Sequence, residues 1–268
     1  MTDMTWEQAV DWLKSQPGRM DLVRACYYDD PLEAAAQRFY DSAEWQAVRE
    51  LLRGRSGAAL DIGAGRGISS YALARDGWIV SALEPDPSES VGAGAIRQLS
   101  EATKVSIKTV VEWGERLPFA DASFDLVYCR AVLHHARNLQ DLCREATRVL
   151  RPGGLFLATR EHVLSKESDL EAFLNSHPLH LCYGGEHAYV LSKYLEAIEK
   201  AGLKISQIFN PNGSDINLHP NTRAQLKQNW ARKLRLPISY MIPGAALDYV
   251  GRRSTVPGRL YSFAAIKG

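Results

Sequence analysis

The chain has 268 residues, a formal net charge of +1 and 46% hydrophobic residues. This length fits one large α/β domain or a core domain with an added cap, and the hydrophobic fraction is that of a globular protein with a substantial core. A net charge so close to zero excludes a general electrostatic field that would attract nucleic acid or an anionic membrane.

The cysteines are scattered and form no C-x-x-C pair; they are Cys26, Cys129, Cys143 and Cys182. This spacing argues against a disulfide framework and against a thiolate zinc site, and it favours a reducing compartment. The first ten residues include two acidic side chains and no long apolar run, so they do not resemble a secretory signal. No stretch is long and apolar enough to span a bilayer. We therefore expect a cytoplasmic protein.

The hydrophobic pattern changes near residue 57. Residues 1–57 have the apolar spacing of helices and are predicted to form an N-terminal helical cap. From residue 58 onward, short apolar runs alternate with helical patterns, which predicts a mainly parallel sheet with helices on both faces. The expected strands are 58–62, 78–83, 105–111, 124–129, 155–159, 203–209 and 259–266, and the expected helices are 68–76, 95–103, 139–150 and 194–201. Ligands of such sheets bind at the carboxyl ends of the strands, so residues that follow a strand are the candidate site residues.

A glycine-rich turn follows the first expected strand, in the segment Asp61-Ile62-Gly63-Ala64-Gly65-Arg66-Gly67. Glycines allow a tight turn and let a ligand approach the backbone, and the next helix offers free N–H groups. The spacing is G-x-G-x-G, which differs from the G-x-G-x-x-G of dinucleotide loops. The carboxylate of Asp61 would repel a pyrophosphate but suits a cationic ligand. A strand–helix turn without a ligand is the alternative.

Glu84 ends the second expected strand, in Leu83-Glu84-Pro85-Asp86. An acid at this place can accept hydrogen bonds from two ribose hydroxyls, as in other nucleoside-binding α/β folds. A surface acid at the start of a proline turn is the alternative. Its position one strand after the glycine turn favours a role in binding.

Together these segments resemble class I S-adenosylmethionine-dependent methyltransferases, and in particular the type-11 methyltransferase subgroup. The segment 59–67 is similar to motif I, and Leu83-Glu84-Pro85-Asp86 is similar to the acidic position that follows it. The similarity continues in order from residue 58 to residue 160, through Leu117-Pro118-Phe119, Ser123-Phe124-Asp125-Leu126-Val127, Val132-Leu133-His134-His135 and Arg151-Pro152-Gly153-Gly154. Each piece alone is weak, but the ordered set is specific.

The resemblance implies a Rossmann-like, three-layer αβα fold with a seven-stranded, mostly parallel sheet and an antiparallel last strand at 259–266. It makes residues 58–268 the methyltransferase core, with substrate-side insertions at about 161–190 and 210–256. The implied cofactor is S-adenosylmethionine, with S-adenosylhomocysteine as product. Asp61 would lie near the methionine part, in some members through water, Glu84 would hold the ribose, and Pro85 would pack beside adenine. The turn beneath the cofactor would comprise Gly63, Ala64, Gly65 and Gly67.

One position departs from the subgroup, which commonly has Asp-Ala before the Leu-Pro-Phe segment. Here Trp113-Gly114 stand there, followed by Glu115. Trp113 would either stack on adenine or bury its ring, and Glu115 would either replace the missing acid or face solvent. Cys129 and Arg130 follow the fourth strand beside the methionine part. Arg130 could hold a carboxylate or form an ordinary salt bridge, and a buried Cys129 is more often a core residue.

His134 and His135 follow the strand at which acceptors arrive in this family. Either imidazole could act as a general base, since it titrates near neutrality; structural histidines are the common alternative. Arg160-Glu161-His162 follows the fifth strand and faces the same region. His162 with His134, His135 or Glu161 could bind a metal in principle. No tight ligand spacing supports a metal, so the sequence favours none.

The acceptor is not defined by the sequence, and we expect a small molecule. Added segments around a scaffold carry specificity, and here they include lid candidates (Tyr27, Tyr28, Arg38 and Tyr40), a polar turn (Tyr183-Gly184-Gly185-Glu186-His187) and a basic stretch (Arg223, Lys227, Arg232, Lys233 and Arg235, with Trp230). The basic stretch is either a solvated helix face or a contact for a macromolecule such as RNA, protein or a lipid-linked glycan. Nucleic acid is disfavoured by the net charge. A non-catalytic cofactor-binding protein is a further alternative, and a dinucleotide oxidoreductase a distant one.

Overall fold

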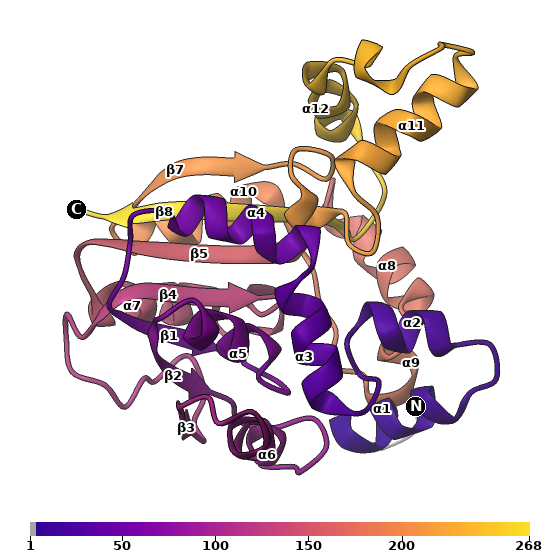
Figure 1. Cartoon of the computed structure of the whole chain (residues 1–268). Coiled ribbons are helices and arrows are strands. Elements are labelled where there is room, and N and C mark those ends of the chain that lie inside the picture. Colours follow the sequence, from indigo (N-terminus) through magenta and orange to yellow (C-terminus); the bar gives the residue numbers. More distant parts are fainter. Residues whose placement is uncertain (1–3) are drawn as a thin grey trace.

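The computed structural model describes residues 4–268 and has one mixed sheet at its centre (Figure 1). Seven strands follow the order β3-β2-β1-β4-β5-β8-β7, and a two-residue eighth strand, β6, pairs with β5. Strand β8 runs antiparallel to β5 and to β7, and the pairs from β3 to β5 are parallel. The predicted Rossmann-like sheet with an antiparallel last strand is therefore confirmed. The strands are β1 (Ala58–Ile62), β2 (Ile79–Leu83), β3 (Ile107–Val110), β4 (Phe124–Arg130), β5 (Leu150–Leu164), β6 (Tyr189–Val190), β7 (Leu203–Phe209) and β8 (Arg259–Lys267).

Helices cover both faces of this sheet and complete the three-layer fold (Figure 1). One hydrophobic cluster joins the strands to α7 (Leu139–Val149) and α10 (Leu191–Lys200). A second cluster joins the opposite face to α3 (Leu32–Tyr40), α4 (Ala43–Leu52) and α5 (Ile68–Arg75). Helix α6 (Ala93–Thr103) packs beside β3. Burial of apolar stripes on both faces is what holds the sheet in place.

Helix α7 shows how the sequence specifies an element. Its apolar residues recur at helical spacing and are all buried: Leu139, Leu142, Cys143, Ala146 and Val149. The side chain of Asn138 accepts hydrogen bonds from the backbone N–H groups of Gln140 and Asp141, so the helix begins with a cap. It ends at Val149, one residue before the prediction, because Leu150 already pairs with Phe124 in the sheet.

Strand β5 is much longer than the predicted 155–159. Its residues between Leu155 and Val163 pair with β8, and a bulge between Ala158 and Glu161 lets the ladder continue past the end of β4. The prediction stopped where the continuous apolar run stops. The extension matters, because it carries Arg160, Glu161 and His162 over the carboxyl edge of the sheet.

The N-terminal segment divides into two packing groups. Helices α1 (Trp6–Ser15) and α2 (Met20–Ala25) share a small hydrophobic cluster with α9 (His180–Tyr183), whereas α3 and α4 belong to the core that covers the sheet. Helices α1 and α2 therefore pack with the insertion after β5 rather than on the sheet. The proposed division into an N-terminal cap at 1–57 and a core at 58–268 stays a prediction. Helix α8 (Leu170–Ser176) precedes α9 in the insertion after β5, with the short helix η2 (Glu167–Asp169) before it.

The insertion at 210–256 begins with the short helix η3 (Asp215–Asn217), which packs on α4. It continues as a helical hairpin that projects from the sheet (Figure 1). Helices α11 (Arg223–Lys233) and α12 (Gly244–Arg253), with η4 (Ser239–Met241) between them, share a small cluster of their own around Ala231, Ile242 and Leu247. In the described part of the chain, none of the helices has the length and apolar character that a membrane crossing requires.

Candidate active site

A cavity of about 1150 Å³ opens at the carboxyl edge of the sheet. It is lined by the ends of β1, β2, β4 and β5, by the start of α1 and by the segment from His177 to Glu186. Sites for one small molecule usually have about 300–1,000 Å³, so this cavity has room for two ligands side by side. Strand β1 lies between β2 and β4, which is the place where the strand order reverses and ligands of such folds bind.

The glycine turn forms the floor of this cavity. Gly63 has φ of +64° and donates its N–H to the carbonyl of Leu83 over 2.8 Å, which fixes the turn to the end of β2. A Cβ at Gly63 would lie 2.7 Å from Cγ2 of Val132, so no larger residue fits without displacement. Gly65 has φ of +53°, and a Cβ there would have only the carbonyl oxygen of Val91 within 4 Å, at 3.9 Å. Gly63, Ala64 and Gly65 all line the cavity, as predicted for a backbone that a ligand approaches closely.

Glu84 lies directly against the glycine turn. Its Oε2 accepts the N–H of Gly65 over 2.7 Å, and its Oε1 accepts the N–H of Asp86 over 3.0 Å. Each carboxylate oxygen keeps one lone pair for a ligand hydroxyl. Burial raises the pKa of Glu84 to about 7, although the two backbone donors oppose this shift. Pro85 lines the cavity beside it.

Two residues of the glycine-turn segment that were predicted to bind the cofactor lie outside the cavity wall. Asp61 is buried beneath α5, and its Oδ2 accepts the hydroxyls of Ser69 and Ser70 over 2.7 and 2.6 Å. Its Oδ1 has no hydrogen-bond partner among the described residues, and burial raises its pKa to about 6. Gly67 has φ of +82° and is the N-cap of α5, so its role is to start the helix. Gly67 therefore makes no direct contact with a ligand in the cavity. Asp61 does not line the cavity either, so it would reach a ligand only through another group.

The segment Trp113-Gly114-Glu115 closes one side of the cavity. The Trp113 ring is 47% exposed, so the prediction of a buried ring is wrong; the Arg137 guanidinium lies 4.1 Å from its centroid. Glu115 is engaged within the protein, because its Oε1 accepts the N–H of Arg137 over 2.8 Å. It is therefore neither a free surface acid nor a side chain reserved for a ligand. Stacking of Trp113 on adenine stays a prediction.

Cys129 and Arg130, which were predicted to lie beside the methionine part of the cofactor, occupy different environments. Cys129 is fully buried in the hydrophobic cluster beneath the sheet and does not line the cavity, because successive strand residues face opposite sides. Arg130 lines the cavity, but its guanidinium is held by Glu44 of α4 over 2.7 and 3.1 Å. The salt-bridge alternative therefore describes Arg130. Arg160 approaches the same carboxylate within 3.7 Å.

His134 is held in one orientation by a buried carboxylate. Its Nδ1 lies 2.7 Å from Oε2 of Glu161, and the same carboxylate accepts the backbone N–H groups of Val132, Leu133 and His134 over 3.1 Å each. An ionised Glu161 only accepts, so His134 carries its proton on Nδ1 and exposes the Nε2 lone pair. Burial places the pKa of His134 well below its usual value, and burial raises the pKa of Glu161 to about 7 against the pull of the backbone donors. His135 is half-exposed and donates its Nδ1–H to the carbonyl of Gly185.

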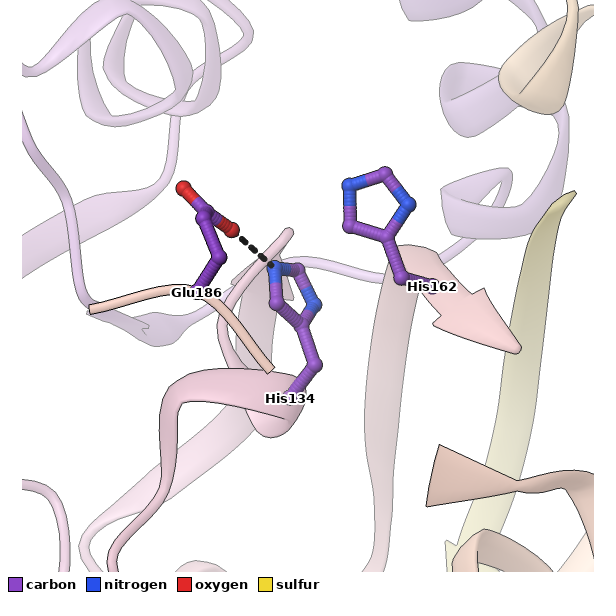
Figure 2. A group of neighbouring side chains, drawn as sticks. All are labelled: His134, His162 and Glu186. Carbon is purple, nitrogen blue, oxygen red and sulfur yellow. Dashed lines mark ion pairs between the residues drawn. The ribbon is translucent and has the colours of Figure 1, made fainter. Parts of the chain in front are cut away.

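Further groups converge on His134 from the extension of β5 and from the insertion that follows it (Figure 2). His162 lies across from it, with ring centroids 4.7 Å apart, and Glu186 places Oε2 3.9 Å from Nε2 of His134. Nδ1 of His177 lies 3.8 Å from the other oxygen of Glu186. Burial lowers the pKa of His162 to about 4, so this imidazole is neutral at physiological pH.

A lid covers the glycine turn, and Arg66 holds it in place. The Arg66 guanidinium donates to the backbone carbonyls of Tyr27 and Asp29 and to the carboxylate of Asp30. Tyr27 and Tyr28 line the cavity, which fits a lid; simple packing is the alternative for each of these side chains. Arg38 and Tyr40 do not line it: Arg38 binds Asp29, and Tyr40 packs beneath arginine side chains of α4 and α5.

No motif or spacing in the sequence pointed to Glu44 or His177 as site residues. Glu44 lies in a helical stretch where an acid normally faces solvent, and only the fold brings it to Arg130, which is 86 positions away. His177 has no motif around it. Arg66 was part of the glycine turn, but its side chain carried no prediction.

Comparison with known proteins identifies similar sequences. Residues 60–158 match a family described as a methyltransferase domain. An uncharacterized methyltransferase of Mycobacterium sp. (strain JLS) is 36% identical over 111 residues, which is 41% of each chain. A ubiquinone biosynthesis O-methyltransferase of Rhizobium leguminosarum bv. trifolii (strain WSM2304) is 28% identical over 167 residues, covering 59% of this chain and 65% of that protein. The chain matches 41–45% of the length of the first curated relatives.

Solved structures share the fold across most of the chain. A geranyl diphosphate C-methyltransferase from Streptomyces coelicolor A3(2), in complex with Mg²⁺, geranyl diphosphate and S-adenosyl-L-homocysteine, superposes with a TM-score of 0.61. The alignment covers 91% of this chain and 88% of that one, at 15% sequence identity. At this identity the likeness concerns the arrangement of helices and strands, including those outside residues 60–158.

Proposed function

We propose that this chain, which contains a class I methyltransferase domain, transfers the methyl group of S-adenosylmethionine to a small acceptor molecule. The observation that carries the proposal is the contact of Glu84 with the backbone of Gly65 at the floor of a cavity large enough for cofactor and acceptor. The family match and the cofactor complexes among the structural neighbours point to the same chemistry.

The residues present fit this cofactor. Gly65 lines the cavity without a side chain, so a ligand can lie close to its backbone, and Glu84 keeps free lone pairs for two ribose hydroxyls. Pro85 and Trp113 offer apolar surface for adenine at the same end of the cavity. When bound, S-adenosylmethionine supplies a methyl group on a sulfonium that is already activated.

The other end of the cavity suits the acceptor. His134, His135, His162 and Glu186 face it, and the lid residues Tyr27 and Tyr28 shield it from water. The protein must align the acceptor with the methyl group, exclude water and remove a proton where the acceptor requires it. We propose His134 as the residue that acts on the acceptor, because Glu161 fixes its tautomer and leaves Nε2 free toward the cavity. His135 donates to Gly185 from a half-exposed position and is the weaker candidate.

Calorimetry with S-adenosylhomocysteine tests the cofactor assignment directly, and a well-folded sample that binds neither it nor S-adenosylmethionine would refute the proposal. Transfer of a radiolabelled methyl group into fractions of a cell extract then tests the activity. Binding of the cofactor without transfer into any fraction would favour a non-catalytic cofactor-binding protein.

The affinity for S-adenosylhomocysteine should fall as the pH decreases through 7. Without ligand, Glu84 has a pKa of about 7, so it takes up a proton below that value and loses an acceptor for the ribose. Binding must then release this proton, which costs up to about tenfold in affinity for each pH unit below the pKa. Calorimetry at about pH 6, 7 and 8 measures how the affinity changes with pH. The Glu84→Gln variant should bind weakly with a flat profile; an equal slope in both proteins would assign the titration to another group.

A second acceptor class, a molecule held in an anionic membrane, is favoured by the hairpin of α11 and α12. Residues 210–256 contain seven basic and two acidic residues. Interleaved with them are six exposed large apolar side chains: Leu234, Ile238, Met241, Tyr249, Val250 and Val256. Basic residues beside exposed apolar ones are typical of surfaces that bind anionic lipid. Trp230 packs in the interior cluster of the hairpin and takes no part in this surface.

Reversing two charges on this hairpin tests the second class. With Arg232→Glu and Lys233→Glu combined, binding to vesicles of phosphatidylglycerol should fall at least about tenfold, since each basic residue near such a surface contributes about 1 kcal/mol. Lys104→Glu combined with Lys204→Glu is the matched control, because both lysines are exposed on other elements. Cosedimentation measures the bound fraction. Equal losses in both double variants, or no binding by the unchanged protein, would leave the small soluble acceptor as the only candidate.

A further inference from the structure

We propose that His134, His162 and Glu186 bind one divalent transition-metal ion, zinc or iron(II), at the acceptor end of the cavity. One ligand atom from each residue lies within 4.8 Å of the other two (Figure 2). The three side chains come from the turn after β4, from the extension of β5 and from the insertion after α9, and all of them line the cavity. The sequence favoured no metal because it shows no short ligand spacing; the fold brings the ligands together instead.

The hydrogen bonds of the two histidines prepare them as ligands. Nδ1 of His134 donates to the Glu161 carboxylate over 2.7 Å, and Nδ1 of His162 donates to the carbonyl of Gly258 over 2.8 Å. Both rings therefore present an unprotonated Nε2 on their other side. Metal-binding histidines have this arrangement almost without exception, with a carboxylate or a backbone carbonyl on the second nitrogen. A pair of merely structural histidines needs no such common tautomer.

Glu186 supplies a buried carboxylate that lacks a matching cation. It is 7% exposed, and its ion-pair neighbours in the described part of the chain are imidazoles only. Its hydrogen bond from the Tyr183 hydroxyl, over 2.9 Å, satisfies one oxygen in part. A buried carboxylate is costly unless it is paired or coordinates a metal. Nδ1 of His177, 3.8 Å away, is also buried with no hydrogen-bond partner among the described residues.

The three ligand atoms, which lie within 4.8 Å of one another, must move closer together to bind one ion. An ion with bonds of about 2.0–2.1 Å in tetrahedral geometry holds its ligand atoms about 3.4 Å apart, whereas Nε2 of His134 and Oε2 of Glu186 are 3.9 Å apart. Glu186 is carried by an insertion loop that contains Gly184 and Gly185, so it can make this movement. His177 and His135 lie beside Glu186, and their imidazole nitrogens are additional candidate metal ligands.

The ligand types select the class of metal. Two imidazoles and one carboxylate form the set of catalytic zinc sites and of non-haem iron(II) sites. Magnesium and calcium prefer oxygen ligands, so this set disfavours them. Three protein ligands leave positions open toward the cavity. If the proposed methyl transfer holds, an ion here would polarise an acceptor oxygen and favour loss of its proton. With Nε2 of His134 bound to the ion, this nitrogen would act on the acceptor only through the metal and not as a free base.

Metal binding itself tests the inference, independently of cofactor and activity. The whole chain is purified without a histidine tag, treated with a chelator and titrated with cobalt(II), then with zinc in competition. We expect one ion per chain, a visible cobalt absorption band typical of nitrogen coordination, and displacement by zinc. Elemental analysis of the untreated protein should find zinc or iron near one equivalent. A titration without a cobalt band, in a sample that is folded by circular dichroism, would overturn the site.

Variants locate the ion. His162→Gln and Glu186→Gln should each weaken cobalt binding at least tenfold, since loss of a direct ligand costs more than the 10–100-fold lost with outer-shell partners. The His180→Gln control, a histidine outside the three ligands, should bind as the unchanged protein does. Equal binding in all of these proteins would show an adventitious surface ion and contradict the proposal. If either ligand variant fails to fold, Glu161→Gln, which keeps a carbonyl acceptor for the backbone N–H groups of the turn but no longer fixes the His134 tautomer, should still weaken binding by 10–100-fold.

Discussion

Replacing Glu44 by alanine should lower the free energy of unfolding by about 3–5 kcal/mol, the usual cost of breaking a buried ion pair from one side. Glu44 is buried and holds the Arg130 guanidinium through two hydrogen bonds, with Arg160 within 3.7 Å. Its removal leaves two buried guanidinium groups without a counter-charge. Urea denaturation followed by circular dichroism measures the loss.

The exposed pair of Glu50 and Arg53 on the same helix provides the control. Glu50→Ala should change stability by less than about 1 kcal/mol, because exposed pairs contribute little. Burial alone would raise the pKa of Glu44, but Arg130 and Arg160 outweigh it and lower that pKa. The contribution of Glu44 is therefore complete above the pKa of an unfolded glutamate and is lost as the pH falls below it. Similar losses for both alanine variants would mean that Glu44 is not paired in solution.

The fold was predictable because each layer leaves a local pattern. The apolar stripe of 139–149 and the short run at 58–62 need only the periods of a helix and of a buried strand. The order of these patterns then implies a parallel sheet. The length of β5 was not predictable, since the residues from Thr159 to His162 are polar and this part of the strand pairs because β8 lies beside it. Such pairing is decided by tertiary contacts rather than by local preference.

The prediction of the site succeeded for residues whose place follows from the end of a strand. It failed for residues whose place depends on the direction of the side chain. The contact of Glu84 with Gly65 follows from two neighbouring strands that end at the same edge. Cys129 and Arg130 are adjacent in sequence but face opposite sides of β4, and only Arg130 reaches the cavity. Strand alternation alone does not say which residue faces which side.

Ligand groups assembled from distant segments left no trace in the sequence. His134 and Glu186 are 52 positions apart in the sequence. The insertion between them follows a path that depends on α9, which packs against α1 and against α8. The same holds for the hairpin at 223–253, where the helical pattern is weak because the hairpin buries only a small cluster of its own. Local periodicity predicts which residues are buried against a large core. These segments do not pack against a large core, so their periodicity is weak.

Replacing Glu84 by alanine should weaken the binding of S-adenosylhomocysteine by about 1–3 kcal/mol, which corresponds to about five- to 150-fold in the dissociation constant. The carboxylate is expected to accept both ribose hydroxyls, and it also fixes the turn through the N–H groups of Gly65 and Asp86. Both losses act in the same direction. Calorimetry measures the change, and thermal unfolding reports whether the turn itself has loosened.

Two variants separate the contact with ribose from the support of the turn. Glu84→Gln retains one carbonyl acceptor, so it can keep a single backbone hydrogen bond but no longer serves both the backbone and two hydroxyls. It should therefore lose part of the affinity while its thermal stability changes less than that of the alanine variant. Glu89→Ala, an exposed acid a few residues along the same loop, should bind normally. Unchanged affinity in the alanine variant would remove Glu84 from the site, and with it the physical reason for placing a nucleoside against the glycine turn.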